Sequence, residues 1–203
     1  LILPSDHKIE NEKEFQRSIN SAILSAENGL IVTFGVKPIN PSTSYGYIKA
    51  KYKINNKNLQ PYEIEEFIEK PNFEKAKKLI KDERISWNSG IFMAKASVLI
   101  EELIKFTPFI ITCCKESLKY KTKDFDFERL DKNSFIKCPN ISIDKAIMEK
   151  TSLGVVLPFK ADWCDIGGWD SLYENTKKDK KGNILIGDVL EFSSKNCLIS
   201  SSS

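Results

Sequence analysis

Short apolar runs alternate along this chain with segments whose apolar residues recur at helical spacing. The run "LIVTFGV" (30–36) is almost continuously apolar, as expected for a strand covered on both faces. Before it, apolar residues from Phe15 to Ala26 recur with helical periodicity and stop at Gly29, a typical helix terminator. This alternation predicts an α/β fold with a mixed, mainly parallel sheet flanked by helices.

The alternation continues to about residue 178. Asn72 and Ser142 are each expected to cap a helix, and Pro71 is expected to stop the strand before it. Residues 179–203 change to short β segments with polar turns. We therefore predict one domain over 1–178 and the start of a C-terminal β module over 179–203. The expected strands are 1–4, 30–36, a strand near 47, 62–70, 85–96 and 154–159.

Composition excludes several classes of protein. No apolar run approaches the roughly 20 residues that cross a bilayer, so no membrane span is expected. The net charge of +3 comes from 31 basic and 28 acidic residues that are interleaved, which argues against a nucleic-acid surface. Five cysteines without a C-x-x-C pair, and a single histidine, argue against a zinc site or a disulfide framework and favour a reducing cytoplasm. Because the chain opens on Leu1, we expect it to be a piece of a longer protein.

Acidic residues follow three of the expected strands. Asp6, Glu69 and Asp165 each stand where a strand ends, and ligands of open parallel sheets bind beyond such ends. Two carboxylates brought together would repel unless a hard cation joined them, and magnesium uses one or two carboxylates beside phosphate oxygens. This predicts phosphate chemistry, with Lys70 for a phosphate and Glu69 and Asn88 for the hydroxyl groups of a polyol.

Each of these residues also has a purely structural alternative. Asp6 could form a turn or cap a helix, and Asp165 could be a loop residue before Gly167. Glu69 could lie at an exposed strand end, and Asn88 could pin a bulge. Taken singly, these residues leave both interpretations open.

Eight segments, in their order and spacing, favour the functional interpretation. They are "LPSDH", "VTFGVKP", "SYGYI", "FIEKP", "WNSGIF", "SIDKAIMEK", "WCDIGGWDSLYE" and "GNILIGDV". Together they closely resemble the sugar-nucleotide pyrophosphorylases, and within them the mannose-1-phosphate guanylyltransferases, over almost the whole chain. The resemblance implies a Rossmann-like nucleotidyltransferase fold. It also implies the reaction of GTP with mannose 1-phosphate to give GDP-mannose and pyrophosphate, with Mg²⁺ as cofactor, for polysaccharide or glycoconjugate synthesis.

The resemblance also implies roles for individual residues. Asp6 and Asp165 would hold magnesium and, with Lys70, form the catalytic set. No general base is needed, because a phosphate dianion is already a nucleophile, whereas the repulsion between two anions must be cancelled. The residues expected to bind substrate are Tyr45, Gly46, Glu69, Lys70, Asn88 and Asp144.

Two departures from the family pattern bear on these expectations. The glycine-rich nucleotide-binding signature of the family precedes "LPSDH" and is not found in residues 1–203, so we expect these residues alone to be inactive. Ser44 stands where the family usually has glycine, and it would be strained if that position required a positive φ.

Three functions stay open at this point. They are a guanylyltransferase, a relative that uses another sugar or base, and a non-catalytic regulatory homologue. The joint presence of Asp6, Glu69, Lys70 and Asp165 argues against the third. The resemblance leaves open whether the protein is a homo-oligomer. The C-terminal β segments resemble a region that leads, in long family members, to a phosphomannose isomerase domain.

Overall fold

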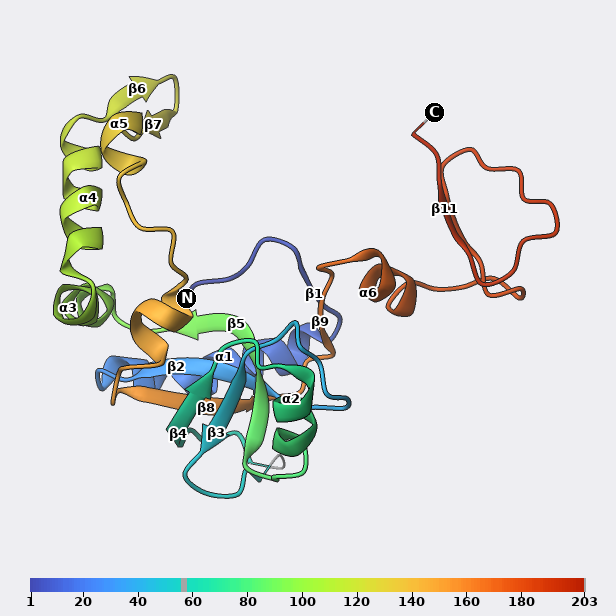
Figure 1. Ribbon diagram of the computed structural model, residues 1–203, viewed down its shortest axis with the longest axis horizontal. Helices are drawn as coiled ribbons and strands as arrows, with labels where there is room; N and C mark the ends of the chain where they lie inside the picture. Colours follow the sequence, from blue (N-terminus) through green and yellow to red (C-terminus); the bar gives the residue numbers. More distant parts are fainter. Residues whose placement is uncertain (56–57, 203) are drawn as a thin grey trace. The chain divides into compact units, whose positions relative to one another are not determined.

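The computed structural model describes residues 1–55 and 58–202 and divides the chain into two compact units (Figure 1). Unit 1 comprises Leu1–Pro4 and Glu12–Ala161, and unit 2 comprises Ser5–Asn11 and Asp162–Ser203. The N-terminal segment Ser5–Asn11 therefore belongs to the same unit as the C-terminal part of the chain. The expected boundary at residue 178 lies within the span of unit 2 and stays a prediction.

Unit 1 is built on a five-stranded sheet that closes on itself in the order β2-β5-β3-β4-β8. Its strands are β2 (Ile31–Val36), β3 (Tyr47–Ala50), β4 (Tyr62–Ile68), β5 (Ile85–Met93) and β8 (Gly154–Phe159). The mixed α/β class is confirmed, but the expectation of mainly parallel pairing is wrong for these strands. Only β2 and β8 pair in parallel, whereas the other four pairings are antiparallel. A continuous apolar run indicates that a strand is buried on both faces, and it does not indicate the direction of the neighbouring strands. β5 is buried on both faces although it is antiparallel to both of its neighbours.

Helices cover this sheet and extend from it. The 16-residue helix α1 (Glu12–Glu27) packs on β2 and β8 and is followed by Gly29 at φ +85°, as expected for a helix terminator. The Asn72 side chain accepts a hydrogen bond from the Lys75 N–H at 2.9 Å, which confirms the expected cap of α2 (Phe73–Leu79). The remaining elements of unit 1 are α3 (Ala96–Phe106), α4 (Pro108–Lys119), the hairpin β6 (Thr122–Asp124) and β7 (Phe127–Arg129), α5 (Lys132–Phe135) and the π-helical turn η1 (Asp144–Met148).

Unit 2 combines a two-stranded ribbon, a short helix and a second strand pair. Its elements are β1 (His7–Ile9), β9 (Trp163–Asp165), α6 (Trp169–Glu174), β10 (Ile184–Ile186) and β11 (Leu198–Ser200). β1 and β9 pair antiparallel, and β10 and β11 pair in parallel. The Asn183 side chain joins the ends of the second pair, because its amide donates to the Ser194 carbonyl and accepts from the Cys197 N–H, each at 3.0 Å.

Two local expectations are wrong. Residues 1–4 form no strand beyond one antiparallel bridge between Ile2 and Phe92, and the strand at this end of the chain begins at His7 instead. Ser142 is not the cap of the following turn. The turn is π-helical, since the Glu149 N–H donates to the Asp144 carbonyl at 2.9 Å. Ile143 occupies its capping position and makes no side-chain hydrogen bond there.

Gly35 of β2 lies where three strands of the sheet approach one another closely. A Cβ at this position would lie 2.5 Å from Val156 Cγ2 on β8 and 2.8 Å from the Ser86 Cβ on β5. We expect Gly35→Ala to lower the free energy of unfolding by about 1–3 kcal/mol, since an added methyl must displace packed strands. Gly154→Ala is the matched control, because its nearest neighbour is the flexible end of Ile64 at 3.2 Å. Urea unfolding should show the smaller loss for the control, and equal losses would contradict the packing argument.

Candidate functional site

Six of the predicted site residues gather in unit 1, and we call this set the polar cluster. They come from the loop before β3, the end of β4, the middle of β5 and the start of η1. The members of the polar cluster are Tyr45, Gly46, Glu69, Lys70, Asn88 and Asp144.

Gly46 lies at the centre of the polar cluster. Its carbonyl accepts a hydrogen bond from the Asn88 N–H at 2.8 Å, just beyond the paired residues of β3 and β5. A Cβ at Gly46 would lie 2.8 Å from Glu69 Oε2 and 3.4 Å from Asn88 Cβ, so a larger residue here would displace the Glu69 carboxylate. The neighbouring Tyr45 ring packs on the Trp87 ring at a centroid distance of 4.9 Å, which fixes the loop that carries Gly46. Ser44, in the same loop, is not among the described residues with positive φ, so the expected strain is not found there.

Asn88 connects the sheet to η1 through its side-chain amide. Oδ1 accepts from the Thr33 hydroxyl at 2.9 Å and from the Gly90 N–H at 3.2 Å, and Nδ2 donates to Asp144 Oδ1 at 2.9 Å. Gly90 has φ +72° and lies where the register between β2 and β5 shifts. Asn88 therefore pins a bulge, as its structural alternative proposed, and at the same time contacts another member of the polar cluster.

The two carboxyl groups of the polar cluster are both shifted toward the neutral form. Burial raises the pKa of Glu69, and the nearby Asp144 carboxylate raises it further, while Lys70 opposes the shift. Burial also raises the pKa of Asp144, against hydrogen bonds from its own backbone, Ser142 and Asn88. A half-desolvated pair of carboxyl groups is well suited to accept hydrogen bonds from hydroxyl groups of a ligand that replaces water.

Lys70 is held in an uncommon backbone conformation at the end of β4. Its φ is +42°, in the left-handed region that non-glycine residues seldom adopt, and its Nζ lies 3.8 Å from Glu69 Oε1. Alternation along a strand would send these two neighbours to opposite faces, but the strand ends at Ile68 and the chain turns. The turn allows both side chains to serve one ligand. Lys70 is mostly exposed, so its charge is available to an anion.

Asp6 and Asp165, the predicted metal ligands, both lie in unit 2 at one end of the β1–β9 ribbon. His7 pairs with Asp165 in the ribbon, which places Asp6 one residue beyond that pair. A Cβ at Gly167 would lie 2.8 Å from Asp165 Oδ1, so glycine leaves room for the carboxylate in the following turn. The Trp163 indole N–H donates to His7 Nδ1 at 3.0 Å, which assigns the proton of a neutral His7 to Nε2.

Within residues 1–55 and 58–202, no group of three or more His, Cys, Asp or Glu side chains is arranged to hold a metal ion. Two carboxylates are nevertheless a donor set that magnesium accepts, because this ion completes its shell with water and phosphate oxygens. Asp6 is exposed and Asp165 is half-buried, so both can be reached from solvent. Carboxylate oxygens suit a magnesium ion chemically, and the binding of one ion by Asp6 and Asp165 together stays a prediction.

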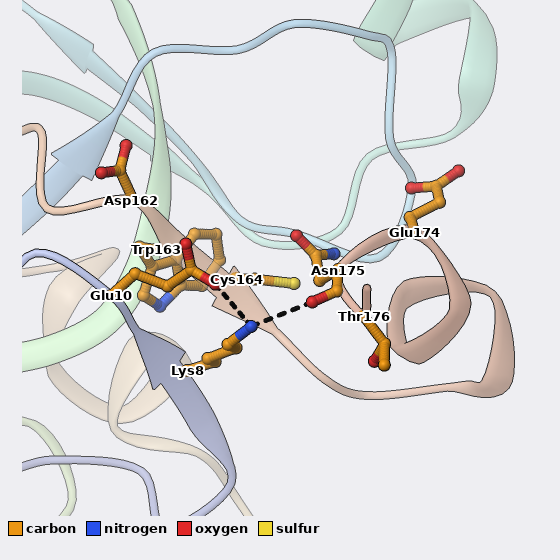
Figure 2. A pocket seen from close by; sticks show the side chains of 8 residues that line it. All are labelled: Lys8, Glu10, Asp162, Trp163, Cys164, Glu174, Asn175 and Thr176. Carbon is orange, nitrogen blue, oxygen red and sulfur yellow. Dashed lines mark hydrogen bonds and ion pairs between the residues drawn. The ribbon is translucent and has the colours of Figure 1, made fainter. Parts of the chain in front are cut away.

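A hollow of about 440 Å³ lies in unit 2, on the ribbon beside the end of α6. Figure 2 shows the side chains that line it. Lys8 Nζ donates to the Asn175 carbonyl at 2.9 Å and pairs with Glu10 at 2.5 Å, so a cation stands at the carboxyl end of the helix. Burial, and then the Asp165 carboxylate, raise the pKa of the Cys164 thiol. No predicted site residue lines this hollow. Its contacts fasten the ribbon to α6, and thus fix both ends of the turn that contains Gly167.

Sequence reasoning missed Thr33 and Gly90, which hold Asn88. A threonine inside an apolar strand is an ordinary strand residue, so the only available signal was a hydroxyl in the otherwise apolar run of β2. Among residues 1–55 and 58–202, no helix combines the length and the apolar character that a membrane span requires.

Comparison with known proteins assigns the family. The family model described as "Nucleotidyl transferase" matches residues 1–182. The chain belongs to the nucleotidyl transferase family. The resemblance and the mixed α/β fold expected from the sequence are thereby confirmed.

Several named relatives are similar over nearly the whole chain. The mannose-1-phosphate guanylyltransferase of Salmonella montevideo is 42% identical over 202 residues, which cover 98% of this chain and 43% of that protein. The xanthan biosynthesis protein XanB of Xanthomonas campestris pv. campestris is 43% identical over 196 residues, with coverages of 97% and 41%. The chain thus spans less than half the length of these relatives.

Two solved structures share the fold. A mannose-6-phosphate isomerase from Helicobacter pylori aligns with a TM-score of 0.72 and 31% identity, over 80% of this chain and 62% of that one. A structure described as mannose-1-phosphate geranyltransferase, from Thermus thermophilus, aligns with a TM-score of 0.78 and 24% identity, over 98% of this chain and 56% of that one. The chain therefore shares its fold with both of these solved structures.

The raised pKa of Asp144 predicts a pH-dependent effect of Asp144→Asn. A carboxyl group whose pKa is higher in the folded state binds its proton more tightly there, so folding stability falls as pH rises through the interval between the two pKa values. The variant lacks this titration. Relative to the wild type, we expect the free energy of unfolding of this variant to increase as pH rises above the ordinary aspartate pKa of about 3.9.

Asp131→Asn is the opposite control for this measurement. Hydrogen bonds from the Ser134 hydroxyl and N–H lower the pKa of Asp131. The Asp131 carboxylate therefore stabilises the fold at neutral pH, and this contribution is lost in acid. Relative to the wild type, the free energy of unfolding of Asp131→Asn should decrease as pH rises. Urea unfolding at a series of pH values decides between these outcomes. Shifts of the same sign in both variants would contradict the environment assigned to Asp144.

Proposed function

We propose that the natural protein transfers a guanylyl group from GTP to mannose 1-phosphate, forming GDP-mannose and pyrophosphate for polysaccharide or glycoconjugate synthesis. One observation carries the proposal. The six residues that the family resemblance assigns to substrate, spread from Tyr45 to Asp144, gather in a single polar cluster in unit 1. The guanylyltransferase of Salmonella montevideo and XanB, both named above, support the choice of substrates.

The polar cluster supplies the groups that a sugar phosphate needs. Glu69 and Asn88 flank the space beside Gly46 and offer acceptors and donors to sugar hydroxyl groups. Lys70, at the turn after β4, offers its charge to the phosphate. Hydrogen bonds would thus orient the sugar, and the charge of Lys70 would orient the phosphate. Such positioning is what an in-line attack on phosphorus requires.

Asp6 and Asp165 are the residues proposed to hold magnesium. When bound, this ion neutralises charge on phosphate oxygens and so lowers the repulsion between two anionic reactants. The room that Gly167 leaves beside the Asp165 carboxylate supports the assignment. The soluble, cytoplasmic location expected from composition is part of the same proposal, since the named substrates are soluble metabolites.

The proposal is tested by measuring pyrophosphate release from mannose 1-phosphate with GTP, ATP, UTP or CTP as the second substrate. We expect turnover with GTP, loss of turnover when divalent ions are chelated, and recovery with Mg²⁺. Asp6→Asn and Asp165→Asn should each raise the Mg²⁺ concentration for half-maximal activity by about tenfold or more, since each removes one charged ligand. Turnover with a pyrimidine triphosphate instead of GTP would identify another member of the family. Absence of turnover with every triphosphate would support a non-catalytic homologue.

Substitutions of Lys70 and Glu69 are expected to change different kinetic constants, although the two residues are neighbours in sequence. Lys70→Ala should mainly lower kcat, by about 10²-fold, because it removes charge stabilisation from the phosphate. Glu69→Gln should mainly raise the KM for mannose 1-phosphate and weaken discrimination against glucose 1-phosphate. Steady-state kinetics of both variants give the answer, and wild-type constants in either would remove that residue from the site.

A further inference from the structure

Thr33 is not a member of the polar cluster, but its buried hydroxyl group contacts Asn88, which is a member. It lies on β2, opposite Phe92 of β5, and none of its surface is exposed. Its Oγ1 lies 2.9 Å from Asn88 Oδ1 and 3.3 Å from the Ile91 carbonyl. A hydroxyl has one proton to donate, and the shorter contact gives it to Asn88.

The orientation of the Asn88 amide is fixed by its backbone neighbour. The Gly90 N–H can only donate, and it lies 3.2 Å from one end of the amide, so that end is the oxygen. The nitrogen then faces Asp144 and donates to Oδ1 at 2.9 Å. The two donors on Oδ1 come from different strands: Gly90 belongs to β5, as Asn88 does, whereas Thr33 belongs to β2.

This difference gives Thr33 a distinct effect. The contact from Gly90 moves with the bulge of β5, so it cannot by itself hold the amide against the rest of the sheet. The contact from Thr33 fastens the amide to a neighbouring strand whose residues are almost all buried. Without the hydroxyl, Oδ1 keeps the donor from its own strand, and the bond from Nδ2 to Asp144 holds the amide to η1 but not to β2. The amide can then shift relative to the sheet.

We infer that Thr33 is a positioning residue for sugar binding, which holds the Asn88 amide so that its nitrogen is presented to Asp144 and to the sugar. The inference rests on the proposed function for the identity of the ligand. Thr33 is buried and acts through Asn88. Its contribution should therefore be seen in binding of the sugar phosphate alone, without a change in binding of the nucleotide.

The test compares Thr33→Val with Thr33→Ser in the natural protein. Valine keeps the shape of threonine and removes the hydroxyl, while serine keeps the hydroxyl and removes a methyl group. We expect Thr33→Val to raise the KM for mannose 1-phosphate about three- to tenfold, the range that one hydrogen bond is worth, with kcat and the KM for GTP within about twofold of the wild type. Thr33→Ser should keep the wild-type KM although it also loses stability.

Two controls separate positioning from general destabilisation. Ser18→Ala removes another buried hydroxyl, which donates to the Glu14 carbonyl in α1, and should change no kinetic constant. The side-chain NH₂ signals of Asn88, followed by NMR without ligand, should shift in Thr33→Val and stay near their wild-type positions in Thr33→Ser.

The outcomes distinguish this inference from the proposed function. A wild type without turnover would sink the proposed function, and the Asn88 signals would still decide whether Thr33 holds the amide. An active wild type with an unchanged KM in Thr33→Val would overturn the inference alone. Equal losses in the valine and serine variants, or unshifted Asn88 signals in Thr33→Val, would also overturn it.

Discussion

Strand β8 completes the sheet of unit 1, because it is paired along both of its edges. It runs parallel to β2 on one side and antiparallel to β4 on the other, and all six of its residues are buried. Its partners are separated from it by long stretches of chain, so closure of the sheet waits for contacts that are distant in sequence. The chain leaves unit 1 directly after this strand, at Ala161, and begins β9 two residues later. β8 is thus the last element of unit 1 along the chain.

The polar cluster is formed where the regular pairing of the sheet is interrupted. Gly46 lies just before β3, Lys70 follows β4 in a left-handed turn, and Asn88 precedes the bulge of β5. At such interruptions the backbone releases side chains from strict alternation, so that neighbours in sequence can share one space. The raised pKa values of Glu69 and Asp144 reflect the burial of their carboxyl groups in this cluster. Burial disfavours the charged form of each group, so forming the cluster lowers the folding stability.

The parts of this structure that depend on local chemistry could be predicted from the sequence, such as the cap at Asn72 and the helix that ends before Gly29. The direction of strand pairing could not, since an apolar run is equally apolar between parallel and antiparallel neighbours. The family motifs indicated the polar cluster, but Thr33 contacts an amide 55 positions away, and nothing in its apolar run marks that partner. A turn before Pro71 could be expected, but the left-handed conformation of Lys70 could not, because the residue before a proline usually adopts an extended conformation. In both cases a tertiary contact or a strained backbone overrides the local preference.

The π-helical turn at η1 has a consequence for insertions and deletions in this part of the chain. Its defining hydrogen bond, from the Glu149 N–H to the Asp144 carbonyl, encloses one more residue than an α-helical turn does. Removing one residue here would restore ordinary helical spacing, at the cost of rotating Asp144 by about 100° relative to the buried side chains that follow it. Ala146, Ile147 and Met148 anchor that later part in the core, so the rotation would fall on the carboxyl group. Homologous proteins that keep an aspartate at this position should therefore keep the length of this segment unchanged, even where its individual residues vary.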